Sequence, residues 1–150
     1  MLDDFIRMIE KERKFILINL PNGLAGIKIQ QGYLMFEDNK HLRVRIINNR
    51  DAYFTFKIIH SESVRTEYEY KISIEDAIEM LKSTEIKLKK IRYKTKFEGN
   101  VVDIDVFENG KQVVEIEYEN ELKSIPNYCG EEVTGKMDYS NIQIARNNRK

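Results

Sequence analysis

Charged and apolar residues alternate along most of this chain, and that period of two constrains the fold more than any other feature. The alternation recurs in runs rich in β-forming residues, which cover residues 9–18, 27–36, 42–48, 52–60, 64–73, 86–97, 101–108 and 112–120. Successive side chains of a strand point to opposite sides, so each run places its charges on one face and its apolar residues on the other. The sequence therefore predicts eight amphipathic strands.

Short turn signals separate the runs, and Asn109-Gly110 is the strongest because both residues tolerate the positive φ of a type I′ hairpin. Strands joined by such short links pair antiparallel, since a parallel crossover needs many more residues. Two helices interrupt the pattern, over residues 73–82 behind a serine cap and over 139–145. Asp3 and Asp4 ahead of apolar residues suggest a further short helix at the N-terminus. The order indicates a mainly β (α+β) fold, either a barrel or a sandwich.

The signs of the charges are segregated by strand. Runs 42–48, 52–60 and 86–97 carry cations on the charged face, whereas runs 101–108 and 112–120 carry carboxylates and run 9–18 is mostly acidic. The plain alternative is a sandwich whose charged faces lie in water, but such faces normally interleave the two signs. Segregation favours charged faces turned inward around one axis, where cations hold an anion beside carboxylates that bind a metal.

The composition restricts the number of domains and the classes of function that this chain can have. The 150 residues suit one domain, and 25 basic against 25 acidic residues argue against a nucleic-acid partner. One cysteine, Cys129, excludes an internal disulfide and suggests a half-buried apolar residue in a reducing, cytoplasmic setting. Charges interrupt the first residues, so we expect neither a signal peptide nor a membrane span. His41 and His60 lack partners at zinc-ligand spacing, and we expect each at the surface or at the edge of a loop.

Apolar faces that point outward need covering. The two helices and the N-terminal segment can cover part of them, and a second subunit would cover more. We therefore expect a homodimer.

The segment Glu10-Lys11-Glu12-Arg13-Lys14 resembles the E-x-E-x-K signature that opens CYTH domains, the triphosphate tunnel metalloenzymes. Further segments follow it in the order and spacing of the short bacterial members: Gln31-Gly32-Tyr33-Leu34, Leu42-Arg43-Val44-Arg45, Thr55-Phe56-Lys57, Arg65-Thr66-Glu67-Tyr68-Glu69, Lys90-Ile91-Arg92-Tyr93, Asp103-Ile104-Asp105-Val106-Phe107, Glu115-Ile116-Glu117 and Glu132-Val133-Thr134-Gly135. The resemblance covers about residues 9–146. It indicates a single domain over 1–150 in which residues 1–8 form a short N-terminal extension. The chain departs from the family at Val102, where relatives have an aromatic residue, and at Asp103, where they have glutamate.

This resemblance implies a closed eight-stranded antiparallel β-barrel, flanked by a few helices, whose tunnel binds a triphosphate with Mg²⁺ or Mn²⁺. It implies metal ligands at Glu10, Glu12, Glu115 and Glu117. It implies basic substrate-binding residues at Lys14, Arg43, Arg45, Lys57, Arg65, Lys90 and Arg92, and supporting acids at Glu67, Glu69, Asp103 and Asp105. The candidate catalytic residues among these are Glu10, Glu12, Lys14 and Glu117.

Hydrolysis of a phosphoanhydride needs the anion held straight, its charge neutralised and a water aimed in line at phosphorus. We therefore predict a metal-dependent triphosphatase, with inorganic triphosphate preferred on the strength of the resemblance. Alternatives in the same tunnel are a nucleoside or thiamine triphosphatase and a class IV-type adenylyl cyclase. An alternative of another class is a non-catalytic module that binds polyphosphate, although binding alone would not need carboxylates beside a polyanion.

Overall fold

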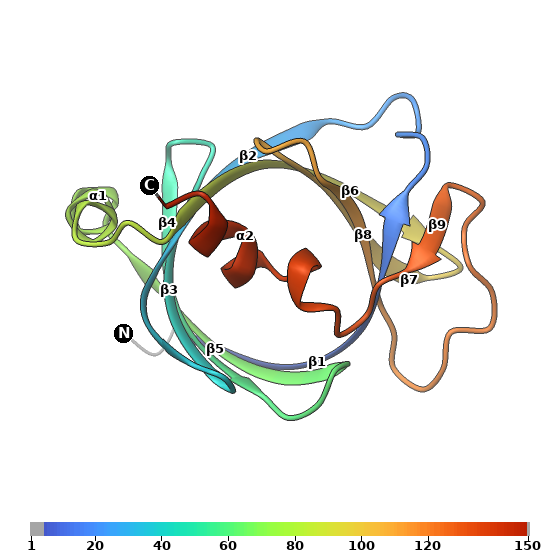
Figure 1. Cartoon of the computed structure of the whole chain (residues 1–150), viewed down its shortest axis with the longest axis horizontal. Coiled ribbons are helices and arrows are strands. Elements are labelled where there is room, and N and C mark those ends of the chain that lie inside the picture. Colours follow the sequence, from blue (N-terminus) through green and yellow to red (C-terminus); the bar gives the residue numbers. More distant parts are fainter. Residues whose placement is uncertain (1–4, 150) are drawn as a thin grey trace.

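Eight antiparallel strands close into a ring (Figure 1) in the computed structural model, which describes residues 5–149 and the side chains from residue 7 onward. The ring runs in the order β1-β5-β4-β3-β2-β6-β7-β8, and β8 pairs with β1 to complete it. Its strands are β1 (Phe5–Leu17), β2 (Gly26–Glu37), β3 (Lys40–Ile47), β4 (Asp51–Ile59), β5 (Val64–Ile72), β6 (Lys87–Phe97), β7 (Asn100–Phe107) and β8 (Gln112–Glu117). The prediction of a closed eight-stranded antiparallel barrel is confirmed.

Strand β1 corrects the prediction for the N-terminus. Its first half pairs with β5 and its second half with β8, so this one strand joins the two ends of the sheet. The expected N-terminal helix is therefore wrong from Phe5 onward, because a helix there would leave the edge of β5 unpaired. Asp3 and Asp4 lie outside the described residues. A short strand that the sequence did not predict, β9 (Cys129–Glu132), pairs with β1 beside the ring.

The hairpin between β7 and β8 forms at the expected place but with different geometry. Only Gly110 has a positive φ, 96°, and its N–H donates to the carbonyl of Phe107 at 2.9 Å. The loop therefore has three residues, with Gly110 in the left-handed region after an ordinary turn, and the type I′ prediction is wrong. The pair Asn48-Asn49 instead has positive φ at both residues, 53° and 56°.

The outer, apolar faces of the strands are covered in two places by the chain itself. Helix α1 (Ile74–Lys82), which Ser73 caps by accepting from the N–H of Asp76 at 3.1 Å, packs on β3 and β4. Its side chains Ala77 and Leu81 join a cluster with Val44, Ile46 and Ala52. On the other side, the segment that leads into β9 covers a cluster made of Phe15, Leu17, Val102, Ile104, Val114 and Ile116. The sandwich alternative is excluded, because the apolar faces lie outside the ring.

The C-terminal segment lies across one opening of the ring (Figure 1) and consists of the short 3-10 helix η2 (Met137–Tyr139) and α2 (Asn141–Asn147). From α2, Ile144 and Ala145 are buried against inward-facing apolar residues of the ring: Tyr33, Leu88, Phe107 and Val113. One end of the ring is therefore filled by an apolar core, and polar side chains line the remainder. No helix among residues 5–149 combines the length and the apolar character that crossing a membrane requires.

Candidate active site

The charged faces of the strands converge inside the ring, as the alternation predicts. Arg43, Glu67, Lys90, Asp103 and Asp105 each expose at most 4% of their surface. Buried charges at this density are stable only when each is paired, hydrogen-bonded or reserved for a ligand. The contacts of each group therefore show which charges are already satisfied.

A cavity of about 420 Å³ runs along the axis of the ring. Most of the predicted site residues line it: Glu10, Glu12, Arg43, Arg45, Lys57, Glu67, Glu69, Arg92, Asp103, Glu115 and Glu117. Lys14, Arg65, Lys90 and Asp105 do not line it and instead hold neighbouring charged groups. Lys94, Tyr53 and Asn141 also line the cavity and were not among the predicted site residues. Lys94 and Tyr53 lie on the predicted charged faces, so a signal existed for them, whereas no pattern indicated Asn141.

One side of the cavity, here called the basic wall, is formed by Arg43 and Arg45 of β3 and Lys57 of β4. Glu67 lies between two of these cations, 3.3 Å from Arg43 Nη2 and 3.6 Å from Lys57 Nζ. Burial opposes ionisation of Glu67, but Arg43 and Lys57 hold its pKa well below the usual range. The Arg43 Nε has no hydrogen-bond partner among the described residues. A buried N–H without an acceptor costs about 1–3 kcal/mol, so this donor is suited to a ligand oxygen.

The basic wall carries more positive charge than its carboxylates neutralise. Burial lowers the pKa of Lys57 to about 8 although Glu67 lies beside it. Burial, together with Arg43 and Arg92, lowers the pKa of Arg45 to about 10. The Arg45 Nε donates to the neutral Gln31 Oε1, at 3.2 Å. These cations are destabilised by their surroundings and would be stabilised by an anion in the cavity.

The opposite side of the cavity, here called the acidic wall, is formed by Glu10 and Glu12 of β1 and by Glu115 and Glu117 of β8. Glu12 lies directly opposite Glu117 in the ladder. Burial raises the pKa of Glu12 and Glu115 adds to the rise, whereas burial, Asp103 and Glu12 raise that of Glu117. Burial and Glu67 raise the pKa of Glu10 to about 8. Carboxylates that raise one another's pKa values along one wall favour a bound cation.

Two members of this region are already paired with cations. The Arg65 Nη1 lies 2.8 Å from Glu12 Oε1, and Lys14 Nζ lies 3.5 Å from Glu115 Oε1. Burial opposes ionisation of Glu115, but Lys14 and other cations lower its pKa to about 2. The acidic wall therefore contains ionised carboxylates at neutral pH.

Strands β6 and β7 form a third side on which charges neutralise one another. Arg92 donates to both oxygens of Asp105, each at 2.8 Å, and Lys90 Nζ lies 2.8 Å from Asp105 Oδ2. Burial opposes ionisation of Asp105, but Arg92 and Lys90 hold its pKa well below the usual range. Asp103 lies 3.0 Å from Lys94 and 3.4 Å from Arg92. These pairs fix the direction of the Arg92 guanidinium toward the cavity.

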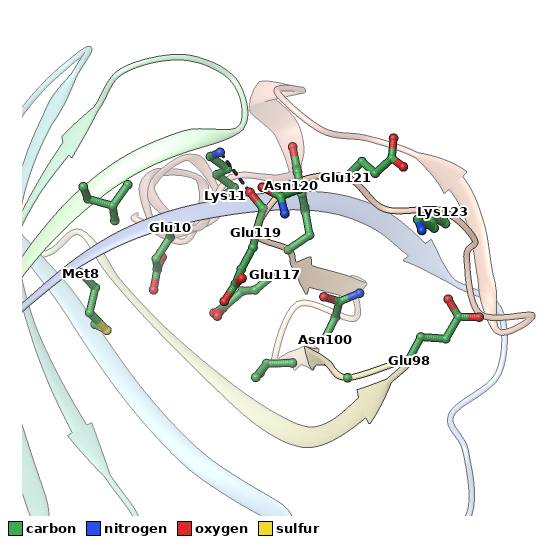
Figure 2. Close-up of a pocket in the computed structure, with 14 residues that line it drawn as sticks. Met8, Glu10, Lys11, Glu98, Asn100, Glu117, Glu119, Asn120, Glu121 and Lys123 are labelled. Atoms are coloured by element: carbon green, nitrogen blue, oxygen red, sulfur yellow. Dashed lines mark hydrogen bonds between the residues drawn. The ribbon is translucent and has the colours of Figure 1, made fainter.

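At the end away from α2, the cavity meets a larger cleft of about 1070 Å³ (Figure 2). The two spaces share Met8, Glu10, Val101 and Glu117. Strand β8 ends at Glu117, whereas the neighbouring strands β1 and β7 extend beyond that level of the ring. The ring is therefore shorter on this acidic side. The tunnel is thus closed at one end and opens at the other beside the acidic wall.

Residues 8–146 match the model of the CYTH domain. The chain belongs to the CYTH domain family. A protein of Acetivibrio thermocellus named inorganic triphosphatase is 38% identical over 147 residues, which cover 92% of this chain and 94% of that protein. The solved structure of the inorganic triphosphatase NE1496 matches with a TM-score of 0.67 and 31% identity, over 91% of this chain and 93% of the other. The PH1012 protein of Pyrococcus horikoshii OT3 matches with a TM-score of 0.59 and 25% identity, over 75% and 80%.

Membership of this family of triphosphate tunnel metalloenzymes implies a divalent metal. The arrangement of carboxylates on the acidic wall of this CYTH domain restricts how such a metal could bind. No three His, Cys, Asp or Glu side chains among residues 5–149 converge closely enough to hold an ion by themselves. Mg²⁺ usually keeps several waters and binds one or two carboxylates together with substrate phosphates. The donor set therefore fits a metal that arrives with its anion rather than a preformed cage.

The predictions for His41, His60 and Cys129 have different outcomes. His41 is buried, 8% exposed, and is the second residue of β3, so it lies at the edge of a loop but not at the surface. It lies two residues before Arg43 and faces inward, with its ring edge-to-face with Tyr33 at 5.7 Å. Burial, Lys57 and Arg43 lower its pKa to about 4, so it is neutral at pH 7. His60 is exposed and Cys129 is half-buried, as expected.

Proposed function

We propose that this CYTH domain is a metal-dependent hydrolase of triphosphate phosphoanhydrides, with inorganic triphosphate as its preferred substrate. The observation that carries the proposal is the pairing of two unsatisfied walls across one cavity. The pKa values of Arg45 and Lys57 on the basic wall are lowered and those of Glu10 and Glu12 on the acidic wall are raised, so the ion pairs already present leave both walls short of opposite charge. A triphosphate with a divalent metal supplies both. The names of the relatives from Acetivibrio thermocellus and of NE1496 support the same substrate.

In this proposal the cations hold the phosphoryl oxygens. Arg43, Arg45, Lys57 and Arg92 line the cavity and offer charge-assisted donors, each contributing about 1.5–3 kcal/mol. Lys14, Arg65 and Lys90 support the site from behind by fixing carboxylates, and they reach the substrate only where those contacts open. The predicted supporting acids act through the cations that they touch, as Glu67 does through Arg43.

Glu10, Glu12, Glu115 and Glu117 are the proposed ligands of Mg²⁺ or Mn²⁺. When bound, the metal supplies neutralisation of phosphate oxygens and a polarised water. Glu10, Glu12 and Glu117 are the proposed catalytic residues, and Lys14, also predicted to be catalytic, acts by positioning Glu115. A carboxylate of the acidic wall orients the attacking water by accepting its hydrogen bond, while the basic wall keeps the anion straight for in-line attack. The apolar packing under α2 excludes bulk water from the closed end.

The test is a panel of triphosphates with each metal. Inorganic triphosphate, ATP and thiamine triphosphate are incubated with Mg²⁺ or Mn²⁺, and orthophosphate and pyrophosphate are measured separately. We expect orthophosphate, released fastest from inorganic triphosphate. Faster release from an organic triphosphate would change the substrate, and pyrophosphate from ATP would indicate a cyclase. Tight binding without turnover in either metal would make the protein a binding module and overturn the proposal.

We also propose a cytoplasmic homodimer whose partners are small anions rather than nucleic acid or membrane. The single half-buried cysteine suits a reducing compartment. Ile9 and Met35 remain 63% and 68% exposed beyond the surfaces that α1 and β9 cover. Light scattering at micromolar concentration tests the dimer, and a monomer would remove that part of the proposal alone.

A further inference from the structure

Arg45 of the basic wall has an amide and a phenol as its neighbours in the sheet, rather than carboxylates. Directly opposite it in the two ladders lie Gln31 on β2 and Tyr53 on β4. Arg92, by contrast, lies opposite Asp105 on β7 and donates to both oxygens of that carboxylate. The residues that flank Arg45 in the sheet therefore do not neutralise its charge.

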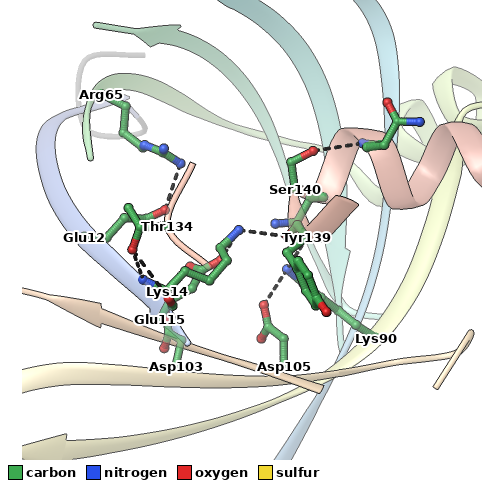
Figure 3. Close-up of polar contacts among 12 residues, drawn as sticks. Glu12, Lys14, Arg65, Lys90, Asp103, Asp105, Glu115, Thr134, Tyr139 and Ser140 are labelled. Atoms are coloured by element: carbon green, nitrogen blue, oxygen red, sulfur yellow. Dashed lines mark hydrogen bonds and ion pairs between the residues drawn. The ribbon is translucent and has the colours of Figure 1, made fainter. Parts of the chain in front are cut away.

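Other cations inside the ring are held by carboxylates (Figure 3). Arg65 Nη1 lies 2.8 Å from Glu12 Oε1, and Lys90 Nζ lies 2.8 Å from Asp105 Oδ2. Such contacts fix the position of a cation, but they also neutralise much of its charge. A cation that keeps its charge for a bound anion needs a partner of another kind.

Gln31 is a partner of that kind for Arg45. Its Oε1 accepts from Arg45 Nε at 3.2 Å, and its Nε2 donates to Tyr33 Oη at 2.9 Å. The phenol thereby orients the amide so that its oxygen, and not its NH2 group, faces the guanidinium. Because the guanidinium is planar, holding its Nε restricts the rotation of the whole group, and Arg45 stays directed toward the cavity that it lines.

Packing on both faces of β2 fixes the backbone that carries Gln31. The Gln31 side chain is fully buried. On the outer face, a Cβ atom at Gly32 would lie 2.7 Å from Leu81 Cδ2, so β2 and α1 are in close contact there. On the inner face, Tyr33 belongs to the apolar core under α2. Gln31 is therefore a rigid support for Arg45.

We propose that Gln31 is a positioning residue, whose neutral oxygen directs the Arg45 guanidinium toward the cavity and leaves its charge for a phosphoryl group. The inference rests on the proposed function and adds to it a residue that acts through Arg45. The electrostatics of the basic wall agree with this role. Burial, together with Arg43 and Arg92, lowers the pKa of Arg45 to about 10, as expected of a cation whose neighbours in the sheet carry no negative charge.

The experiment compares Gln31→Glu and Gln31→Met with the wild type. Glutamate has the same size and keeps both contacts, because the Tyr33 hydroxyl can turn to donate to it, but it gives Arg45 a negative partner. Methionine keeps the length of the side chain and removes the acceptor. Binding of linear tripolyphosphate is measured by isothermal titration calorimetry in EDTA, and the stability of the ligand-free protein is measured by urea denaturation.

We expect Gln31→Glu to raise the Kd by about tenfold or more, the effect of one charge-assisted hydrogen bond, and to raise the urea midpoint. Gln31→Met should raise the Kd by about threefold, because the ligand must then order the guanidinium. In an Arg45→Met background, Gln31→Glu should no longer raise the midpoint and Gln31→Met should no longer change the Kd. Gln30→Glu is the matched control and should leave the Kd unchanged, since Gln30 lies on the outer face of β2 and donates to Asn49 Oδ1 at 3.0 Å.

Three outcomes overturn the inference. The first two are a Gln31→Glu variant that binds tripolyphosphate as tightly as the wild type and one that unfolds at a lower urea concentration, because either would show that Arg45 is not short of a carboxylate. The third is an increase in Kd by Gln31→Met that is the same with and without Arg45, which would show that Gln31 only packs. If Gln31→Glu does not fold, the methionine variant in the two backgrounds decides alone. A wild type that binds tripolyphosphate and hydrolyses no triphosphate would end the proposed function, and the Kd values would still test Gln31.

Discussion

Replacing Arg45 by methionine should make the free protein more stable and its binding of triphosphate weaker. Arg45 is half-buried on the basic wall, and the burial together with Arg43 and Arg92 lowers its pKa to about 10. Its group is protonated in both the folded and the unfolded chain below pH 10, so the whole unfavourable energy is present at pH 7. One pKa unit corresponds to about 1.4 kcal/mol, so this depression corresponds to about 3 kcal/mol before solvent screening.

With screening taken into account, we expect Arg45→Met to raise the free energy of unfolding by about 1–3 kcal/mol. The same change removes a charge-assisted donor, so the Kd for tripolyphosphate should rise by about 10- to 100-fold. Urea denaturation without ligand measures the first quantity, and isothermal titration calorimetry measures the second.

Arg92→Met is the matched control, because Arg92 lines the same cavity but is paired with both oxygens of Asp105. Breaking that buried pair should lower the free energy of unfolding by about 3 kcal/mol. The opposite signs distinguish a cation that the fold leaves without a carboxylate from a cation that the fold pairs. If Arg45→Met destabilised the protein as Arg92→Met does, or left binding unchanged, the assignment of surplus charge to the basic wall would be refuted.

Glu12→Gln should lower turnover by about 100-fold or more, since it removes a proposed metal ligand while keeping an acceptor for its neighbouring arginine. Glu119→Gln, an exposed acid beyond the tunnel, should change little, and similar rates in both variants would contradict the acidic wall as the metal site. Chelation by EDTA should abolish turnover and added Mg²⁺ or Mn²⁺ should restore it; a rate unaffected by the chelator would exclude a metal requirement. His41→Gln should flatten the acid side of the stability profile. The pKa of His41 is about 4 in the fold against an ordinary 6.5, so the unfolded chain takes up the proton first and the wild type loses stability as the pH falls. Between pH 7 and pH 4 that loss should be about 3 kcal/mol, present in the wild type and in the exposed His60→Gln control but absent from His41→Gln, as chemical denaturation at each pH would show.

The period of two was sufficient to predict the ring, because in a strand the residue number fixes the face. Arg43 and Asp105 were predicted to face inward on this basis alone, and both are buried inside the ring. The same rule applied to His41, which lies two residues before Arg43 on the same face, and the prediction of a surface or loop-edge position did not use that signal. The rule does not apply where the chain is too short or too irregular to alternate. The four-residue strand β9 was missed for this reason.

The depth of each side chain along the tunnel could not be predicted from the sequence. Lys90 and Arg92 occupy the same face of β6 and looked equivalent, yet Arg92 lines the cavity and Lys90 lies behind Asn141. The difference arises from α2, whose first residue follows Lys90 by 51 positions in the sequence and which fills one end of the ring. The alternation within a strand carries no information on how far a distant segment extends into the ring. It could therefore predict which side chains face inward, but not how deep along the tunnel each of them lies.

The charges inside the ring divide by the direction in which the fold moves their pKa values, and this division explains why acids and bases coexist in one cavity. The pKa of Asp105 is lowered and that of Arg92 is raised, which marks two groups that neutralise each other. The pKa of Arg45 is lowered and that of Glu10 is raised, which marks groups that the fold leaves short of opposite charge. These groups cannot neutralise each other, because they belong to β3 and β1 on different sides of the cavity. A polyanion alone would relieve the bases and worsen the acids, and a cation alone would do the reverse. Only the two together relieve both walls, so each ligand should bind more tightly in the presence of the other.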